Sequence, residues 1–456
     1  MQAGRVARSV VAVTAAIFLV RVLGEPWNAG FDPFFPDTAS YIRVSHRSPF
    51  HPRFWFDERP PTYPLVLWII GGGGRAVVVF QTVAYVVAWI WLGAVVWQRI
   101  ASRPVAAVAI GVLVLTAVQA RWTLWTTLML TESLSITLAV AAVAAWWQFV
   151  AEPLRWRLVV ATSITAAWML LRDSNAVSFT VFAAPALLLA ILLLRRAATD
   201  LRRYSAIGLA GLIAVGAFSW IGQVASDRGE ASFHNNVGLR WLPDPEMTSF
   251  FESRGMPVDD VLLARTGSDA WAAGEAFLRD PALSEYRAWA DGRGRVAAAE
   301  SFVLAAPFWL DGLRDDLGRS LREEYRGYDL FDVGGRVPRR TLGPFDPIGS
   351  GVMLAVATVA SAAYALIAAR RRRALGLYAG FLLIPAWIDL YLSYAGDAVE
   401  VSRHLVGPLS RLSVAFVVVV AIGIDSAIAW MRESAGPAVD DDDLAWSAQD
   451  GSEATW

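Results

Sequence analysis

The sequence predicts an all-α, polytopic membrane protein with about ten transmembrane helices and a small helical insert outside the membrane. Apolar residues make up 56% of the 456 residues, and the mean hydropathy is +0.44. Soluble domains are about 45–50% apolar, so the excess must face a solvent other than water. The apolar residues come in blocks of about the length that a helix needs to cross a bilayer. Arginine concentrates in alternate stretches between these blocks, as the positive-inside rule requires.

Ten apolar segments are long enough for transmembrane helices. The first, near residues 6–24, is short, but no small-x-small cleavage site follows it, so an uncleaved span is favoured over a secretory signal. The run 63–70 is too short to cross and ends in four glycines, which predicts a helix lying in the membrane interface. The ten predicted spans lie near 6–24, 76–98, 104–120, 128–150, 156–171, 176–194, 205–223, 348–369, 375–394 and 405–431.

The arginine pattern predicts the orientation of a multi-pass protein in the plasma membrane, with both termini cytoplasmic. The clearest helix of the outer insert is expected at Arg295–Tyr325. The chain has 0 Cys, which excludes disulfides, Cys-ligated zinc and thiol catalysis. The predicted division is an N-terminal membrane module (1–224) with its first outer loop (25–62), an extracytoplasmic domain (225–346), C-terminal transmembrane helices (347–432) and a disordered acidic cytoplasmic tail (433–456).

Ionisable residues gather at the predicted outer ends of the spans. A charge inside a membrane is costly and needs a partner or water. Each group alone has an ordinary alternative, such as a solvated loop carboxylate or an arginine that snorkels to the interface. Because all five groups fall on one predicted side, we expect them to line a single outward-facing cavity. They are Asp32 and Asp37; Asp57, Glu58, Arg59 and Tyr63; Glu132; Arg172 and Asp173; and Asp397, Glu400, Arg403 and His404.

Four motifs in this set resemble, in order, those of the GT-C superfamily of integral-membrane glycosyltransferases, which use polyprenyl-phosphate sugars as donors. The first is PDTASY, with Asp37 and Tyr41, and the second is the proline-rich RPPTYPL of residues 59–65. The third is TES, with Glu132 near the start of the fourth span. The fourth is SRHLVGP, with Arg403 and His404 before the last span. The resemblance covers about residues 30–200 and 390–415, and does not extend to the insert.

The resemblance implies an inverting hexosyl- or pentosyltransferase on the outer face of the membrane. Asp37 would be the general base on the acceptor hydroxyl. The leaving lipid phosphate requires cationic donors, and arginine binds phosphate oxygens through two parallel hydrogen bonds. The implied donor-binding residues are Arg59, Tyr41, Tyr63, Glu132, Arg172, Arg403 and His404. The implied partners are a polyprenyl-phosphate sugar donor, a glycan, glycolipid or protein acceptor, and membrane lipids, with no nucleic acid.

The sequence departs from the family pattern in its first loop. Many relatives have two adjacent acids there, and some use them with a divalent metal. Here Asp37 stands between Pro36 and Thr38, so Asp32 or Glu132 could supply a second carboxylate only through folding. We therefore predict no metal and no cofactor, with Mg or Ca as the alternative.

Two other classes of function remain open from the sequence. A transporter or lipid flippase would place its charges near the bilayer midplane. A non-catalytic partner in envelope assembly would use the 225–346 insert for docking. No motif identifies the sugar or the acceptor. The stretch 233–236 is compatible with an acceptor site, but a turn following a span is favoured.

Overall fold

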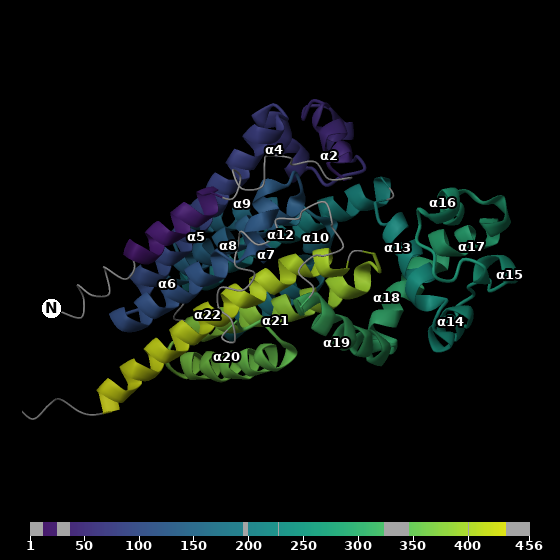
Figure 1. The fold of residues 1–456 in the computed structure, drawn as a ribbon. Helices are drawn as coiled ribbons and strands as arrows, with labels where there is room; N and C mark the ends of the chain where they lie inside the picture. The colour runs from purple at the N-terminus through teal and green to yellow at the C-terminus, as the bar shows by residue number, and fades with distance from the viewer. Residues whose placement is uncertain are drawn as a thin grey trace, which may run out of the picture.

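The structure, a computed structural model, describes residues 12–24, 37–194, 199–226, 228–322, 346–399 and 401–434. All regular secondary structure in these residues is helical, which confirms the all-α prediction for the described part of the chain. Long helices form a bundle, and a lobe of short helices projects from one end of it (Figure 1). The helix Ala12–Gly24 begins, and α22 (Val401–Ser434) ends, at the opposite end of the bundle.

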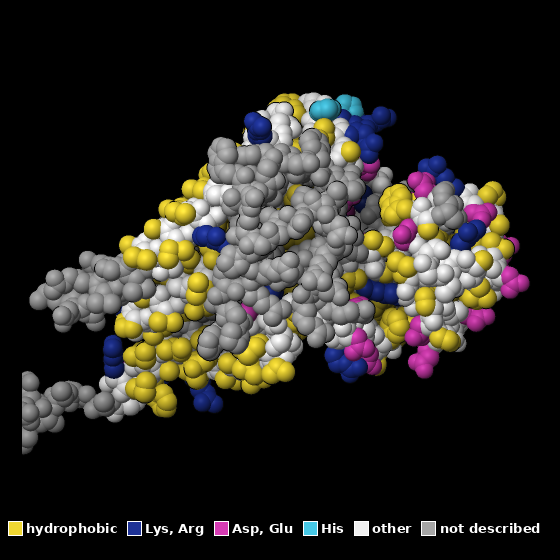
Figure 2. All heavy atoms as spheres, viewed as in Figure 1, with side chains coloured by type: hydrophobic (Ala, Val, Ile, Leu, Met, Phe, Trp, Pro, Cys, Tyr) yellow, Lys and Arg dark blue, Asp and Glu magenta, His cyan; other side chains and the backbone are white. Residues whose placement is uncertain are grey.

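Seven helical segments in the described residues are long and apolar enough to cross a membrane, or nine if each of two bent pairs is one span. Hydrophobic side chains cover the flank of the bundle in Figure 2, as contact with lipid requires. A multi-pass membrane protein is therefore supported, while the count of ten stays a prediction. The seven are α5 (Gly74–Arg99), α8 (Thr131–Ala151), the run of α10, η2 and α11 (Asp173–Leu193), α12 (Thr199–Ala225), α20 (Gly351–Arg371), α21 (Arg373–Gly396) and α22.

The other three predicted spans appear as shorter helices. The first is described only as Ala12–Gly24. The third is α6 (Arg103–Ala117), and the chain then bends by 63° into α7 (Ala120–Thr123) and η1 (Leu124–Thr127). The fifth is α9 (Arg155–Met169), of 15 residues. At 1.5 Å per residue α9 is about 22 Å long, less than the roughly 30 Å of a hydrocarbon core.

Residues 37–70 contain three short helices at one edge of the bundle: α2 (Thr38–Ser45), α3 (Pro52–Trp55) and α4 (Thr62–Ile70) (Figure 1). α4 coincides with the predicted interfacial helix. It ends at Gly71 with φ +84°, a left-handed conformation that glycine adopts without strain. Trp68 and Ile69 are 45% and 67% exposed, so α4 presents an apolar face that suits an interface.

The described part of the insert is a helical lobe with an aromatic core. Phe233, Trp241, Phe251 and Trp289 pack with ring centroids 3.8–6.2 Å apart. Acidic and basic side chains are frequent on its surface (Figure 2). Its elements are α13 (Glu230–Asn236), η4 (Val237–Trp241), α14 (Pro245–Glu252), α15 (Asp260–Leu263), α16 (Ala272–Arg279), η5 (Pro281–Leu283), α17 (Ser284–Trp289), η6 (Ala290–Gly294), α18 (Arg295–Leu304) and α19 (Ala306–Arg322).

Two predictions for the insert are wrong. The single helix expected at Arg295–Tyr325 is broken after Leu304, and the two halves meet at 75°. Pro307 explains the break, because it lacks an N–H for helix hydrogen bonding and is tolerated only in a first turn. The end of the predicted helix lies outside the described residues. The stretch 233–236 is not a turn but part of α13, with His234 buried.

The lobe is fixed to the end of α21 by hydrogen bonds. Arg240 donates to the carbonyl of Tyr394 at 2.6 Å, and Asn236 donates to that of Ala395 at 3.0 Å. The Tyr394 hydroxyl donates to Asp316 at 2.9 Å. Gly312 lies so close to Tyr394 that a Cβ there would stand 2.4 Å from the hydroxyl oxygen. The lobe and this end of the bundle are therefore held in a defined relation.

Acid is expected to destabilise the lobe through His234. Burial, with the nearby Arg295 and Arg287, lowers the pKa of His234 to about 4. In the unfolded chain the pKa is about 6.5, so the unfolded state binds more protons between these values. The free energy of unfolding should fall as the pH drops from about 6.5 to about 4, by about 3 kcal/mol at most. Thermal unfolding in detergent across this range measures the loss. His234→Gln should flatten the pH dependence and His46→Gln should not; an unchanged slope in His234→Gln would contradict the prediction.

Candidate active site

Asp37 immediately precedes α2 and is held by two arginines. Arg59, which comes before α4, donates from Nη2 to Asp37 Oδ1 at 2.9 Å. Arg403, from the first turn of α22, places Nη1 2.8 Å from Asp37 Oδ2. Arg59 also donates from Nε to the hydroxyl of Ser40, at 2.7 Å. Residues from three distant segments thus meet at one carboxylate.

Behind Asp37 lies a second carboxylate, that of Glu132 in the first turn of α8. Arg403 donates from Nε to Glu132 Oε1 at 2.6 Å, and Arg172 lies 3.4 Å from the same oxygen. Glu132 and Arg403 are only 1% and 4% exposed. Burying a charge without a partner is very unfavourable, so this buried pair depends on the contacts between its members.

His404 extends the network towards the lobe. Its Nδ1 atom lies 3.1 Å from Arg172 Nη2. A guanidinium can only donate, so Nδ1 must accept and the proton of a neutral imidazole resides on Nε2. That atom faces Asp397 Oδ2 at 3.8 Å. Asp397 in turn accepts hydrogen bonds from Ser232 and Asn235 of α13, at 2.6 and 3.0 Å.

Two tyrosines support the network from the side. The guanidinium of Arg59 lies over the ring of Tyr41, 4.7 Å from its centroid. The rings of Tyr41 and Tyr63 pack edge to face, with their centroids 5.1 Å apart. The Tyr63 hydroxyl donates to the neutral side chain of Gln81, at 2.9 Å. The eight residues predicted as general base or donor-binding residues therefore belong to one connected cluster, in which Tyr63 is a packing residue.

The cluster favours anions. Among the five charged groups in direct contact, Arg59, Arg172 and Arg403 carry three positive charges, and Asp37 and Glu132 carry two negative ones, which leaves one positive charge in excess. Burial alone would raise the pKa of Asp37, but Arg403 and Arg59 outweigh it and hold the pKa below its ordinary value. The Asp37 side chain is 31% exposed. An ionised carboxylate is therefore accessible beside an excess of positive charge.

Other members of the predicted set lie apart from this network. Glu58 pairs with Arg43 at 2.7 Å, and Asp57 pairs with Arg47. Asp173 pairs with Arg228 at 3.2 Å. Asp32 and Glu400 lie outside the described residues. In the described part of the chain no three His, Asp or Glu residues gather as a metal site, and both network carboxylates bind guanidinium groups.

One buried ion pair next to the network was missed from the sequence. Arg411 of α22 pairs with Asp389 of α21, which also accepts a hydrogen bond from Ser178. The Arg411 guanidinium lies over the ring of Trp168, 4.9 Å from its centroid. Charged residues inside apolar spans are rare and need a partner, so the positions of Asp389 and Arg411 in the sequence were a sufficient signal.

Comparisons with known proteins find similarity only to solved structures, at low sequence identity. No protein-family model and no curated protein sequence matches the chain. Similar solved structures include the archaeal oligosaccharyltransferase AglB from Archaeoglobus fulgidus in complex with an inhibitory peptide and a dolichol-phosphate, and the same enzyme in the apo form. Each is 14% identical, with a TM-score of 0.43, over 90% of this chain and 50% of that one.

A third structure of the same enzyme, tethered to an acceptor peptide containing the NVT sequon, is 15% identical over 90% of this chain and 49% of that one, with a TM-score of 0.43. The chain thus spans about half the length of these structures. At this identity and TM-score the likeness carries no argument about the site, whose chemistry is inferred from its own residues and their geometry.

Proposed function

We propose that this protein is an inverting glycosyltransferase that moves a hexosyl or pentosyl group from a polyprenyl-phosphate donor to an acceptor hydroxyl. The observation that carries the proposal is the placement of Asp37. It is a partly exposed carboxylate beside Arg59 and Arg403, with the second carboxylate Glu132 buried behind Arg403. A site for this reaction needs an ionised base next to fixed cations, and the cluster has both.

In the proposed reaction the acceptor hydroxyl attacks the anomeric carbon of the donor. A bond forms between the acceptor oxygen and that carbon, while the bond from the carbon to the phosphate oxygen breaks. Asp37 takes the hydroxyl proton, and the polyprenyl phosphate departs with the bonding electrons. Because attack and departure occur on opposite faces of the sugar, the anomeric configuration inverts.

The arginines are the proposed phosphate site. Arg172 and Arg403 are held by Glu132, so both guanidinium groups are ordered before a ligand arrives. Such preorganised donors stabilise developing negative charge without reorganising during the reaction. Arg59 is 28% exposed and borders Asp37 on the accessible side. A departing phosphate at this edge would gain two or more charge-assisted hydrogen bonds.

The remaining parts of the proposal concern partners and sidedness. The site would face the outside of the plasma membrane with both termini in the cytoplasm, and no metal or other cofactor would be required. The acceptor would be an envelope glycan, a glycolipid or a protein. The lobe is the proposed acceptor platform on geometric grounds, because Asp397 joins it to His404.

The test is sugar transfer by the full-length protein in reconstituted membranes, with a panel of polyprenyl-phosphate sugars and isolated envelope acceptors. We expect transfer from one donor, with an inverted product by NMR. Binding of each donor is measured in parallel. Binding and transmembrane movement of a donor without transfer would favour the transporter or flippase. No binding of any donor would favour the assembly partner; either outcome overturns the proposal.

A further inference from the structure

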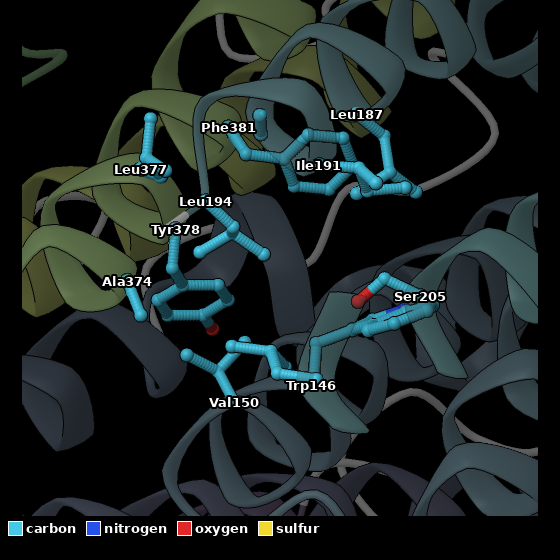
Figure 3. Close-up of a pocket in the computed structure, with 12 residues that line it drawn as sticks. Trp146, Val150, Leu187, Ile191, Leu194, Ser205, Ala374, Leu377, Tyr378 and Phe381 are labelled. Carbon is cyan, nitrogen blue, oxygen red and sulfur yellow. The ribbon is translucent and has the colours of Figure 1, made fainter. Parts of the chain in front are cut away.

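An apolar pocket opens between four helices at the end of the bundle opposite the ion-pair network. In Figure 3, Leu187 and Ile191 of α11 lie across the pocket from Trp146 and Val150 of α8. Residues of α21 and the start of α12 complete the wall, among them Tyr378 and Ser205 (Figure 3). Its volume is about 50 Å³, which suits a short stretch of one hydrocarbon chain.

The polar atoms of the two large aromatic side chains point out of the pocket. The Tyr378 hydroxyl donates to the carbonyl of Val143 at 2.7 Å. The indole Nε1 of Trp146 donates to the Thr165 hydroxyl at 2.9 Å. With these two groups hydrogen-bonded inside the protein, both rings present carbon to the pocket, and a hydrocarbon occupant leaves neither of these two donors unpaired.

A basic hollow adjoins the pocket, and Leu377 lines both. Arg370 and Arg371 line it from the end of α20, and Arg373 lines it from the start of α21. Arg371 pairs with Glu433 at 2.5 Å. Within the described residues, Arg370 and Arg373 have no carboxylate partner. The hollow has a volume of about 590 Å³, enough for a phosphate-bearing headgroup.

The position along α21 places this double cavity at the second membrane interface. Leu377 and Tyr394 are 17 residues apart on one helix, which is about 26 Å at 1.5 Å per residue. The hydrocarbon core is about 30 Å thick. With Tyr394 next to the lobe and network, Leu377 lies at the depth of the other leaflet's headgroups.

We propose that the pocket and the basic hollow together bind one anionic phospholipid. Its phosphate contacts Arg370 and Arg373, and the upper part of one acyl chain enters the pocket beside Tyr378 and Trp146. An arginine-rich membrane edge alone would attract any anionic surface. The apolar pocket adds the second requirement, a chain attached to the anion. An uncharged lipid satisfies only the pocket, and inorganic phosphate satisfies only the hollow.

Native mass spectrometry of the full-length protein in neutral detergent tests the proposal, with phosphatidylglycerol, phosphatidylcholine, an uncharged polyprenol and inorganic phosphate as separate probes. We expect one phosphatidylglycerol to be retained more tightly than any other probe. The double variant Arg370→Gln/Arg373→Gln should bind it about 30-fold more weakly. The matched control Arg103→Gln/Arg432→Gln removes two charges at the same membrane end and should leave its affinity unchanged.

A second pair of variants tests the pocket. Ala190→Phe should fill it and weaken phosphatidylglycerol binding, whereas Ala362→Phe, on the exposed face of α20, should not. Four outcomes would overturn the proposal. They are equal retention of phosphatidylglycerol and phosphatidylcholine, equal losses in the two double variants, preferred retention of the polyprenol, and arginine-dependent retention of inorganic phosphate alone.

Discussion

Replacing Arg403 with alanine should destabilise the protein by about 3–5 kcal/mol, the cost typical of breaking a buried ion pair by removing one partner. Glu132 is 1% exposed and, among the described residues, would keep only Arg172, at 3.4 Å, as a charged partner. In the same part of the chain, Asp37 would keep only Arg59 as an ion-pair partner. The variant leaves a buried carboxylate with one long ion-pair contact, so the loss comes from unpaired charge rather than from lost packing.

Denaturant-induced unfolding in mixed micelles measures this loss. The matched control is Arg43→Ala, which breaks the ion pair between Arg43 and Glu58. The side chains of this pair are 63% and 43% exposed. Exposed pairs contribute about 0–1 kcal/mol. A loss for Arg403→Ala within that range would show that the Arg403–Glu132 contact is not an important stabilising pair.

A double variant separates folding from donor binding. Arg403→Met/Glu132→Met removes both charges and replaces them with apolar side chains, which often restores the stability of a buried pair. We expect the double variant to be more stable than Arg403→Ala and still deficient in donor binding, since the phosphate has lost a guanidinium. Full donor binding by a stable double variant would rule out Arg403 as a phosphate ligand.

The sequence was most informative where one physical requirement dominates. The bilayer demands about 20 apolar residues per helix, so the segments at 76–98 and 405–431 appear as α5 and α22 with only small shifts in their ends. The clustering of Asp37, Glu132 and Arg403 was inferred because each is an ionisable residue at a span end that needs a partner. In the structure Arg403 forms ion pairs with both carboxylates.

The sequence was least informative where structure depends on contacts between distant segments. The break after Leu304 follows from Pro307, but its angle of 75° depends on packing around Trp309, which is fully buried. The docking of α13 on Asp397 joins residues 162 and 165 positions apart. No local periodicity carries that information, so the link between the lobe and His404 was beyond sequence reasoning.

Replacing Asp37 with asparagine should lower turnover by about 10²–10⁴-fold, the usual contribution of a general base. The amide has nearly the shape of the carboxylate and cannot accept the acceptor's proton. Donor binding should be retained or tightened, because the substitution leaves Arg59 and Arg403 with one negative charge fewer beside them. The expected result is therefore a fall in kcat without a rise in KM for the donor.

The pH profile distinguishes a base from a structural residue. Arg403 and Arg59 keep the pKa of Asp37 below its ordinary value against the effect of burial, so the base is ionised at neutral pH. Wild-type turnover should fall only when the pH drops below the ordinary pKa of an aspartate, which is about 3.9. The residual activity of Asp37→Asn should lack this acid limb.

Glu58→Gln is the matched control, since it neutralises another arginine-paired carboxylate of the same loop outside the network. Its kcat and pH profile should equal those of the wild type. If Asp37→Asn kept its turnover within about tenfold and retained the acid limb, Asp37 would not be the base. The only other carboxylate among the directly paired groups is that of Glu132, whose side chain is 0% exposed behind Arg403 and out of reach of an acceptor hydroxyl. Direct displacement with a carboxylate base of this network would then be untenable.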